Sequence, residues 1–238
     1  MIYFIGAGSG DSELITLKGY KILKKADAIL YTGSLVSKEI LNFCKKEAII
    51  KDSQNMSYEE IFSFLKKYRN KTVARVHTGD PSIYSTIARQ IEFLEKEKIP
   101  FKIIPGVTAA FAAAASLGIE YTIPGVSQTL VLTRIEGKTK NPEPLYNILS
   151  LKHSSLVFYL SINLIDKLKK EALKAGYSKD TPCWVVYKAS WMDEKIFKGT
   201  IEDIGEKVSH IKGIALILFG DFLNQKERYS SKLYKEKR

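Results

Sequence analysis

Short runs of β-branched and apolar residues alternate with longer amphipathic stretches through the first hundred residues, and this change of period constrains the fold more than any other feature. Such alternation is typical of βα units and of a parallel sheet. Ser57, with Glu60 three positions later, predicts a capping box, and Ser82 predicts a second helix N-cap. We expect strands at 2–5, 28–31, 48–50, 72–76 and 101–104, and helices at 12–25, 37–43, 58–68, 83–95 and 108–117.

The pattern breaks around Gly118–Gly125, where we predict a domain boundary. The strands expected at 183–188 and 195–199 are joined by too few residues for a helix, so they form an antiparallel hairpin and the second sheet is mixed. The predicted fold is two α/β domains with a cleft between them, the N-terminal sheet mainly parallel and the C-terminal sheet mixed. We expect further strands at 128–134, 155–159 and 214–219, helices at 144–151, 163–175 and 201–211, and domains at 1–119 and 120–223 with a basic tail at 224–238.

Positive charge exceeds negative charge in this chain of 238 residues, with a net charge of +11. The tail from Asn224 carries six Lys or Arg against two Glu, which leaves +7 on the predicted folded body. Such a surplus favours a polyanionic partner, either nucleic acid or a small ligand with many carboxylates. Charge alone leaves both alternatives open.

Several classes of protein are excluded by absences in the sequence. The longest weakly polar stretch, Val107–Ile119, is too short to span a membrane, and no secretory signal follows Met1, so we expect a cytoplasmic protein. Cys44 and Cys183 form no close pair, which favours reduced, structural thiols. The histidines show no metal-ligand spacing among themselves or with the cysteines, and no metal site is predicted.

A glycine-rich segment, Gly6–Asp11, follows the first predicted strand. It differs from the dinucleotide-binding fingerprint because Asp11 stands where the third glycine belongs, and no acidic residue ends the second strand. Two interpretations remain open: the small residues turn the chain sharply, or they let the backbone approach a ligand or a partner domain closely.

Two more loops follow predicted strands. His77–Tyr84 places Asp80 at the carboxyl end of a central strand, where open α/β sheets bind ligands; alternatively, Asp80 and Ser82 only cap the next helix. Pro105–Ala110 leads into a run of alanines that suits close helix packing or a flat ligand wall.

In the second half, Arg134, Lys138 and Lys140 crowd one loop, where they could grip carboxylates or form a solvated face. Trp184 and Trp191 are predicted to lie in the core or to line the cleft, with stacking on a flat ligand as the alternative.

The combination of these segments resembles the tetrapyrrole methyltransferase family, and the resemblance covers nearly all of residues 1–223. The segments that carry it in the N-terminal half are Gly6–Asp11, Glu13–Gly19, Gly79–Tyr84 and Pro105–Ala110. Those similar to the branch that methylates precorrin-4 or cobalt-precorrin-4 at C-11 in cobalamin biosynthesis are Tyr31–Val36, Val126–Arg134 and Tyr187–Glu194. The chain departs from the family pattern at Ser9 and Met192, where proline is usual, and at Ser85, where glycine is common.

The resemblance implies a homodimer of two-domain subunits that fold S-adenosylmethionine into the cleft. It implies donor-binding roles for Ser9, Thr78, Gly79, Asp80, Ile83, Thr108, Ala109, Leu160 and Ala189. A sulfonium methyl is already activated, so the protein needs to orient the acceptor and exclude water rather than supply a nucleophile. Candidates for orienting the substrate or handling a proton are His77, Asp80 and Asp11, and candidates for the substrate's carboxylates are Arg134, Lys138 and Lys188.

Two other functions are alternatives to this one. Some relatives of the fold methylate ribosomal RNA, which a basic surface suits equally well. A non-enzymatic RNA-binding module would need a recognisable RNA-binding signature, and the sequence has none. The prediction is therefore a small tetrapyrrole substrate, with neither nucleic acid nor a membrane as partner.

Overall fold

The computed structural model describes residues 1–33 and 35–224, and these divide into two compact units. The first holds Met1–Ala112 together with Ser190–Met192, and the second holds Ala113–Ala189 and the described residues from Asp193 onward. The division falls inside helix α4 (Ala109–Leu117), a few residues before the predicted boundary. Apart from Asn224, the predicted basic tail lies outside the described residues.

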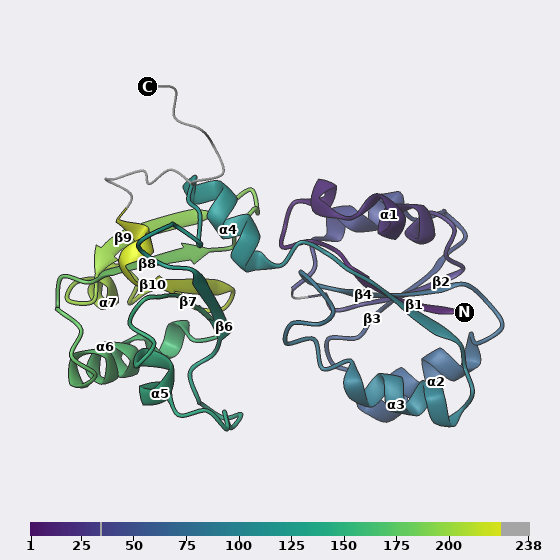
Figure 1. Cartoon of the computed structure of the whole chain (residues 1–238). Helices are drawn as coiled ribbons and strands as arrows, with labels where there is room; N and C mark the ends of the chain where they lie inside the picture. Colours follow the sequence, from purple (N-terminus) through teal and green to yellow (C-terminus); the bar gives the residue numbers. More distant parts are fainter. Residues whose placement is uncertain (34, 225–238) are drawn as a thin grey trace. The chain divides into compact units, whose positions relative to one another are not determined.

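The first unit is built on an all-parallel five-stranded sheet in the order β3-β2-β4-β1-β5 (Figure 1). Helix α1 covers one face, and α2 and α3 cover the other. The strands are β1 (Ile2–Gly6), β2 (Ala28–Tyr31), β3 (Ile49–Asp52), β4 (Val73–His77) and β5 (Phe101–Ile104), and the α-helices are α1 (Leu17–Leu23), α2 (Tyr58–Lys67) and α3 (Ala88–Lys96).

Alternation along the strands sends successive side chains to opposite faces of this sheet. Ile5 and Val76 pack toward Leu23 of α1, whereas Phe4 packs toward Leu65 of α2 and Leu94 of α3. The sheet is therefore apolar on both faces, as a parallel sheet covered by helices requires.

The predicted strands of the first unit are confirmed to within two residues, but several helices differ from expectation. The capping box of Ser57 and Glu60 is confirmed at the start of α2. The helix predicted from Ser12 is split, because Thr16 caps α1 after a separate 3₁₀ turn, η1 (Ser12–Leu14). The segment predicted as a helix at 37–43 is a 3₁₀ helix, η2 (Lys38–Phe43).

The predicted N-cap at Ser82 is wrong. Helix α3 begins at Ala88, its N-cap is Ile87, and no side chain caps it. The preceding segment is irregular, with Tyr84 at φ +52° and Thr86 at φ +50°, both in the left-handed region that a helix excludes. The alternative that Asp80 and Ser82 merely cap a helix is therefore also wrong.

The second unit is built on a mixed five-stranded sheet in the order β6-β7-β10-β8-β9. β6 pairs parallel with β7, and the remaining pairs are antiparallel, including the predicted β8–β9 hairpin. The strands are β6 (Thr129–Thr133), β7 (Ser154–Tyr159), β8 (Pro182–Tyr187), β9 (Lys195–Thr200) and β10 (Ala215–Phe219). The other helices are α5 (Leu145–Leu149), α6 (Ile165–Lys174), α7 (Ile204–Lys207), and the 3₁₀ helices η3 (Ile162–Leu164) and η4 (Asp221–Leu223).

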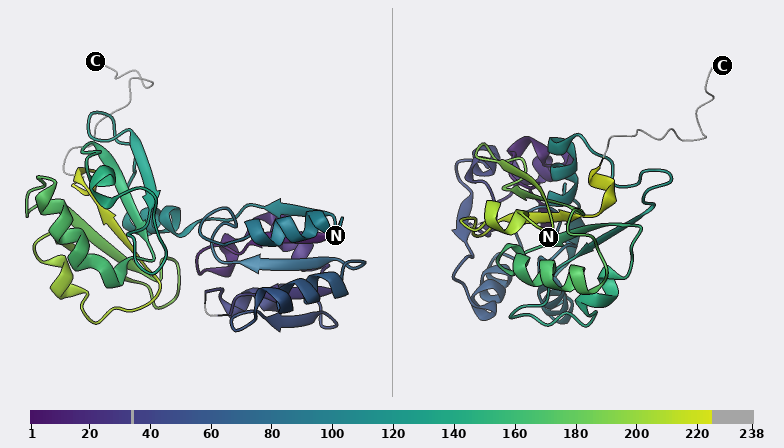
Figure 2. Two further views of the ribbon diagram at one scale, coloured as in Figure 1. Left: turned by 90° about the horizontal axis from the view of Figure 1, so that it is seen from below. Right: turned by 90° about the vertical axis from the view of Figure 1, so that its left-hand side faces the viewer.

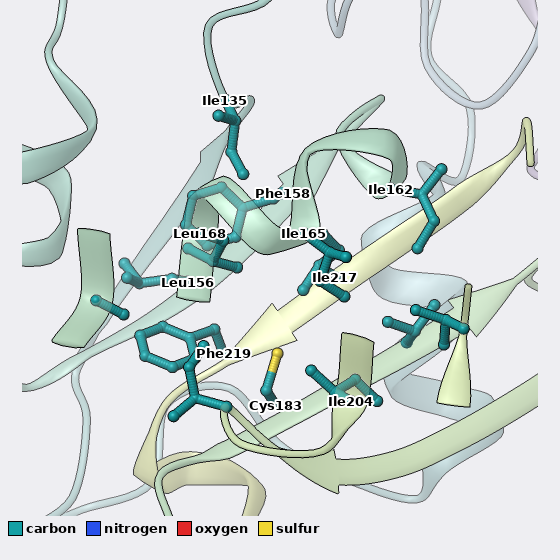
Figure 3. Packing of buried hydrophobic residues seen from close by; sticks show 14 of the residues in the cluster. Ile135, Leu156, Phe158, Ile162, Ile165, Leu168, Cys183, Ile204, Ile217 and Phe219 are labelled. Carbon is teal, nitrogen blue, oxygen red and sulfur yellow. The ribbon is translucent and has the colours of Figure 1, made fainter. Parts of the chain in front are cut away.

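One face of this sheet and the helices α5, α6 and α7 enclose an apolar cluster. Figure 2 shows α6, in green, lying along that face. In Figure 3, Phe158 and Phe219 from the sheet pack toward Leu168 of α6, and the thiol of Cys183 points into the same cluster. These aromatic side chains are fully buried and anchor the second unit.

Both thiols are unbridged. Burial raises the pKa of Cys44 to about 11, and burial raises the pKa of Cys183 further. Such thiols stay protonated at neutral pH, as expected for structural cysteines. Within residues 1–33 and 35–224, no helix combines the length and hydrophobicity that a membrane span requires.

Candidate functional site

Three loops follow β1, β4 and β5, which are neighbours in the first sheet. We call residues 6–11 the first loop, residues 77–87 the second loop and residues 105–109 the third loop. Because the strands run parallel, their carboxyl ends and these loops meet at one edge of the sheet. That edge is where open α/β sheets bind ligands, and it is the candidate site of the first unit.

Backbone hydrogen bonds join the first and second loops. The N–H of Ala7 donates to the carbonyl of His77 at 2.8 Å, and the N–H of Gly79 donates to the carbonyl of Gly8 at 2.7 Å. Gly8 and Gly79 thereby form an isolated antiparallel bridge beyond the ends of two parallel strands. The main chain itself fixes the relative position of these loops.

Glycine is required where the three loops touch. A Cβ on Gly6 would lie 2.6 Å from the Cα of Gly106, and a Cβ on Gly106 would lie 2.2 Å from the carbonyl oxygen of Gly79. Gly79 adopts φ +61°, a conformation that favours glycine. The glycines thus bring the loop backbones into contact with one another, a use that neither sequence interpretation anticipated.

The carboxylate of Asp80 links the second loop to the third. Its Oδ2 accepts a hydrogen bond from the N–H of Gly106 at 2.9 Å, and its Oδ1 accepts from both the N–H and the hydroxyl of Ser82. Burial alone raises the pKa of Asp80, but the bonds from Ser82 and Gly106 outweigh burial and leave the pKa below its ordinary value. Asp80 is therefore ionised at neutral pH and holds two loops together.

Ser85 stands where the family pattern commonly has glycine, and its hydroxyl has a local role. It donates to the carbonyl oxygens of Asp80 and Ile83, each at 3.2 Å. These bonds hold the irregular part of the second loop, including the left-handed Tyr84 and Thr86. The serine at position 85 thus contributes two side-chain hydrogen bonds to this turn.

The side chain of His77, the first residue of the second loop, is buried with its ring centroid 5.9 Å from that of Phe4. It is 4% exposed, and among the described residues its Nε2 has no hydrogen-bond partner. Burial lowers the pKa of His77 well below its ordinary value, and the positive charge of Arg75 lowers it further. The imidazole is therefore neutral at physiological pH.

Arg75 is a buried cation that the sequence analysis missed. Its Nε donates to Gln90 at 3.1 Å and one Nη donates to Ser53 at 3.0 Å, and burial lowers its pKa to about 10. A charged residue inside an otherwise apolar strand, two positions before His77, is the signal that could have revealed it.

Asp11 and Ser9 occupy the far end of the first loop. Asp11 is exposed, and its carboxylate accepts a hydrogen bond from the N–H of Glu13 at 2.8 Å, which caps η1. Ser9 is buried, and its hydroxyl lies 2.7 Å from the hydroxyl of Ser190, one of the three late residues of the first unit. The pairing with Ser190 was not predicted, because 181 positions separate the two residues.

The other predicted donor-binding residues of the first unit belong to the second and third loops. Thr108 is buried beside Gly79, whose ideal Cβ would lie 3.5 Å from the Cα of Thr108. Ala109 begins α4, and Thr78 and Ile83 are partly buried in the second loop. The structure thus gathers Ser9, Thr78, Gly79, Asp80, Ile83, Thr108 and Ala109 on three joined loops at one sheet edge.

The remaining predicted site residues belong to the second unit. Its strands β6, β7 and β8 all run in the same direction, so their carboxyl ends share one edge of the mixed sheet. Arg134, Leu160 and Lys188 each follow directly after one of these strands, and Ala189 and Lys138 lie just beyond. The sheet thereby brings the predicted residues of the second unit to one edge.

Ser161 ties two of these strand ends together. Its fully buried hydroxyl accepts a hydrogen bond from the N–H of Ile135 at 2.8 Å and donates to the carbonyl of Tyr159 at 2.7 Å. Leu160, between Tyr159 and Ser161, is 58% exposed at φ +52°, so its side chain projects from the edge. No pattern in the sequence pointed to this role of Ser161.

The basic residues at this edge differ in their contacts. The ammonium of Lys188 pairs with Asp193 at 2.6 Å, and this hydrogen bond raises the pKa of Lys188. Lys138 is exposed, and the backbone carbonyl of Arg134 accepts from Asn141 at 2.9 Å. Within the described residues, no group of three His, Cys, Asp or Glu side chains could hold a metal ion.

Comparison with known proteins shows the family to which this chain belongs. The model of the tetrapyrrole (corrin/porphyrin) methylases matches residues 1–205. A cobalt-precorrin-4 C(11)-methyltransferase of Methanocaldococcus jannaschii is 49% identical over 98% of this chain and 92% of its own length.

Solved structures agree. A cobalt precorrin-4 methyltransferase structure has a TM-score of 0.90 at 42% identity, covering 93% of this chain and 95% of its own. The uroporphyrin-III C-methyl transferase of Thermus thermophilus, complexed with S-adenyl homocysteine, has a TM-score of 0.79 at 25% identity, covering 99% of this chain and 95% of its own. The resemblance based on the glycine loops is confirmed, and the chain belongs to the tetrapyrrole methylase family.

Proposed function

We propose that this protein is an S-adenosylmethionine-dependent C-methyltransferase that acts at C-11 of precorrin-4, with or without cobalt, in cobalamin biosynthesis. The observation that carries the proposal is the 49% identity to the Methanocaldococcus jannaschii cobalt-precorrin-4 C(11)-methyltransferase, which extends over 98% of the chain. Similarity of this extent spans both units and every loop described above.

The donor is proposed to bind at the joined loops of the first unit. The contacts among Gly6, Gly79 and Gly106 exclude side chains from the loop junction. A ligand there would be recognised by main-chain N–H and C=O groups. Buried hydroxyls of Ser9 and Thr108 add polar groups there. These features fit the predicted donor-binding set of Ser9, Thr78, Gly79, Asp80, Ile83, Thr108 and Ala109. The family resemblance also implies Leu160 and Ala189, which belong to the second unit.

The side chains of this protein then have to orient the methyl acceptor and exclude water, and none has to act as a nucleophile. S-adenosylmethionine supplies an activated methyl group, so no side-chain nucleophile is needed. Asp80 orders the loops through Gly106 and Ser82, and the neutral, buried His77 is poorly suited to strong base catalysis. The proposal keeps Asp80, His77 and Asp11 as the candidates for orienting the acceptor or transferring one of its protons.

The acceptor's carboxylates are proposed to meet basic residues at the carboxyl edge of the mixed sheet. Arg134 and Lys188 follow strands that end at this edge, and Lys138 is exposed close behind Arg134. Arginine and lysine bind carboxylates through charge-assisted hydrogen bonds. This placement supports a substrate that bears several acetate and propionate groups.

We also infer a homodimer that works in the cytoplasm. The dimer rests on the family resemblance, and the two free thiols, Cys44 and Cys183, support a reducing compartment. Light scattering on the purified protein at several concentrations tests the dimer, and a monomeric mass throughout would refute it.

The function is tested by incubating the protein with donor carrying a ¹³C-labelled methyl group and, in parallel, cobalt-precorrin-4, metal-free precorrin-4, uroporphyrinogen III or ribosomal RNA. We expect one methyl group to be added to a precorrin-4 form, at C-11 by NMR, and none to the other acceptors. Transfer to RNA or only to uroporphyrinogen III would overturn the proposal, as would binding of donor without transfer to either precorrin-4 form.

A further inference from the structure

Three residues of the β8–β9 connection, Ser190–Met192, belong to the first unit, and two of them bind its first loop. The indole N–H of Trp191 donates to the carbonyl of Ser9 at 2.7 Å. The hydroxyl of Ser190 lies 2.7 Å from the hydroxyl of Ser9 and accepts from the N–H of Asp11 at 3.2 Å. We call Ser190 and Trp191 the clasp.

The ring of Trp191 also explains the residue between Ser9 and Asp11. A Cβ on Gly10 would lie 2.3 Å from Cδ1 of Trp191, well inside van der Waals contact. Gly10 is not among the glycines with positive φ, so its backbone conformation does not by itself require glycine. Position 10 therefore needs glycine because the indole occupies the space of a side chain.

Two residues near or within the clasp have strained backbone conformations. Lys188 at φ +52° and Ser190 at φ +65° are left-handed non-glycine residues on either side of Ala189. Such conformations persist only when surrounding contacts hold them, and they gather at functional positions. The three hydrogen bonds to the first loop are contacts of that kind.

We propose that Trp191 is a positioning residue for the methyl donor, which fixes the main chain of Ser9 and Gly10 in the shape that binds S-adenosylmethionine. This inference rests on the proposed function, because Ser9 is one of the proposed donor-binding residues. The proposed route is through the first loop, because the indole N–H binds the Ser9 carbonyl and the ring occupies the space that a side chain at position 10 would need.

The test measures affinity for S-adenosylhomocysteine by calorimetry, together with kcat and both KM values for methyl transfer. Trp191→Phe removes the indole N–H but keeps a ring beside Gly10. We expect it to weaken binding and to raise the donor KM about three- to tenfold, the factor that one lost hydrogen bond of ordinary strength accounts for. The KM of the tetrapyrrole should not change.

Gly10→Ala provides an independent test of the same contact. Alone it should weaken donor binding, because the new methyl group collides with the indole. In a Trp191→Ala background the collision is gone, so Gly10→Ala should have no further effect. If the losses of donor affinity from Gly10→Ala and Trp191→Ala add up in the double variant, the two residues do not act through each other and the proposal is overturned.

Trp184, the only other tryptophan of the chain, gives a matched control. It lies in β8 with Lys198 over its ring, and Trp184→Phe should leave the donor KM unchanged. In that variant Trp191 is the sole tryptophan, and its fluorescence should change when S-adenosylhomocysteine binds, whereas Trp191→Phe should give no such change.

The outcomes separate this proposal from the function it rests on. If the unsubstituted protein binds S-adenosylhomocysteine and methylates precorrin-4, but Trp191→Phe and Trp191→Ala leave donor affinity unchanged, only the role of Trp191 fails. If the unsubstituted protein binds no S-adenosylhomocysteine, both proposals fail.

Discussion

The N–H of Gly106 donates to the carboxylate of Asp80 at 2.9 Å, so an acidic side chain of the second loop fixes the start of the third. The same carboxylate accepts from the N–H of Ser82 at 2.8 Å. Asp80 was predicted from its position after a central strand. In the structure it follows β4, which lies between β2 and β1 in the sheet. Its carboxylate organises the loops that are proposed to bind the donor.

Asp80→Asn should destabilise the protein at neutral pH and weaken donor binding, because an amide nitrogen facing the Gly106 N–H cannot accept its hydrogen bond. The folded-state pKa of Asp80 lies below its ordinary value of 3.8, so this stabilisation is present above that value. It is lost as the pH falls through the lowered pKa. Urea unfolding across an acidic pH series should show the variant and the unsubstituted protein converging at low pH.

Asp180→Asn, at an exposed aspartate of the second unit, is the matched control for this measurement. A constant difference between Asp80→Asn and the unsubstituted protein at every pH would contradict the role assigned to the carboxylate.

Gly6→Ala should disrupt the loop junction. The new Cβ would meet backbone atoms of Gly106 and Gly79 at 2.6 Å, and no side chain can rotate away to relieve the overlap. We expect a loss of about 1–3 kcal/mol in the free energy of unfolding, in the range of overpacking substitutions. Donor affinity should fall more than tetrapyrrole affinity, which calorimetry with each ligand would check.

The matched control is Gly205→Ala in α7, where the new Cβ would lie 3.2 Å from a carboxylate oxygen of Asp166, the end of a side chain that can move. Its stability should match or exceed that of the unsubstituted protein. If Gly6→Ala behaved like Gly205→Ala, the close approach of the loops would not be important.

His77→Phe should flatten the dependence of stability on pH. Burial holds the folded-state pKa of His77 well below 6.5, so below that pH the unfolded chain takes up a proton that the folded protein does not. The unsubstituted protein therefore loses stability as the pH falls below 6.5, by up to about 1.4 kcal/mol per pH unit. The substitution also removes a buried nitrogen that has no partner among the described residues, so stability at neutral pH should hold.

Thermal unfolding of both proteins between neutral and mildly acidic pH checks this expectation, with His153→Gln, at an exposed histidine, as the control. An unchanged pH profile would refute it. A fall in kcat at constant KM values would instead assign the imidazole a part in proton handling.

Arg134→Glu should raise the KM of the tetrapyrrole about tenfold or more, because it replaces the proposed charge-assisted hydrogen bond to a substrate carboxylate with like-charge repulsion. The donor KM should not change. Lys179→Glu makes the same charge reversal at an exposed residue of the second unit and separates a local effect from a change in overall charge. A tetrapyrrole KM equal to that of the unsubstituted protein would remove Arg134 from the site.

Local patterns carried most of the fold prediction. Strands and the β8–β9 hairpin follow from period and spacing, and the Ser57–Glu60 capping box follows from residues within one helical turn. The helix prediction failed at 83–87, where a hydrogen bond to the Asp80 carbonyl and left-handed conformations at Tyr84 and Thr86 override helix propensity. The late start of α3 could not be derived from a pattern that looks amphipathic from Ile83 onward.

The site was predictable in its loops but not in its internal contacts. The three glycine-bearing loops can be recognised in the sequence because each follows a predicted strand. The partners of Ser9 lie 181 and 182 positions away, at Ser190 and Trp191, and no spacing rule links residues so far apart. The hydrogen-bond partners of Ser161 and Arg75 depend on tertiary packing, although a charged residue inside an apolar strand could have drawn attention to Arg75.

Ser190–Met192 completes a unit whose other residues all precede Ala113. On the ribosome, strands β6, β7 and β8 are synthesised before these three residues emerge. N-terminal domains generally fold first during synthesis. Here the first loop cannot form its contact with the Trp191 indole until much of the C-terminal sheet has been translated. A nascent chain stalled before Trp191 would therefore carry a folded parallel sheet whose first loop still lacks its contacts with Ser190 and Trp191.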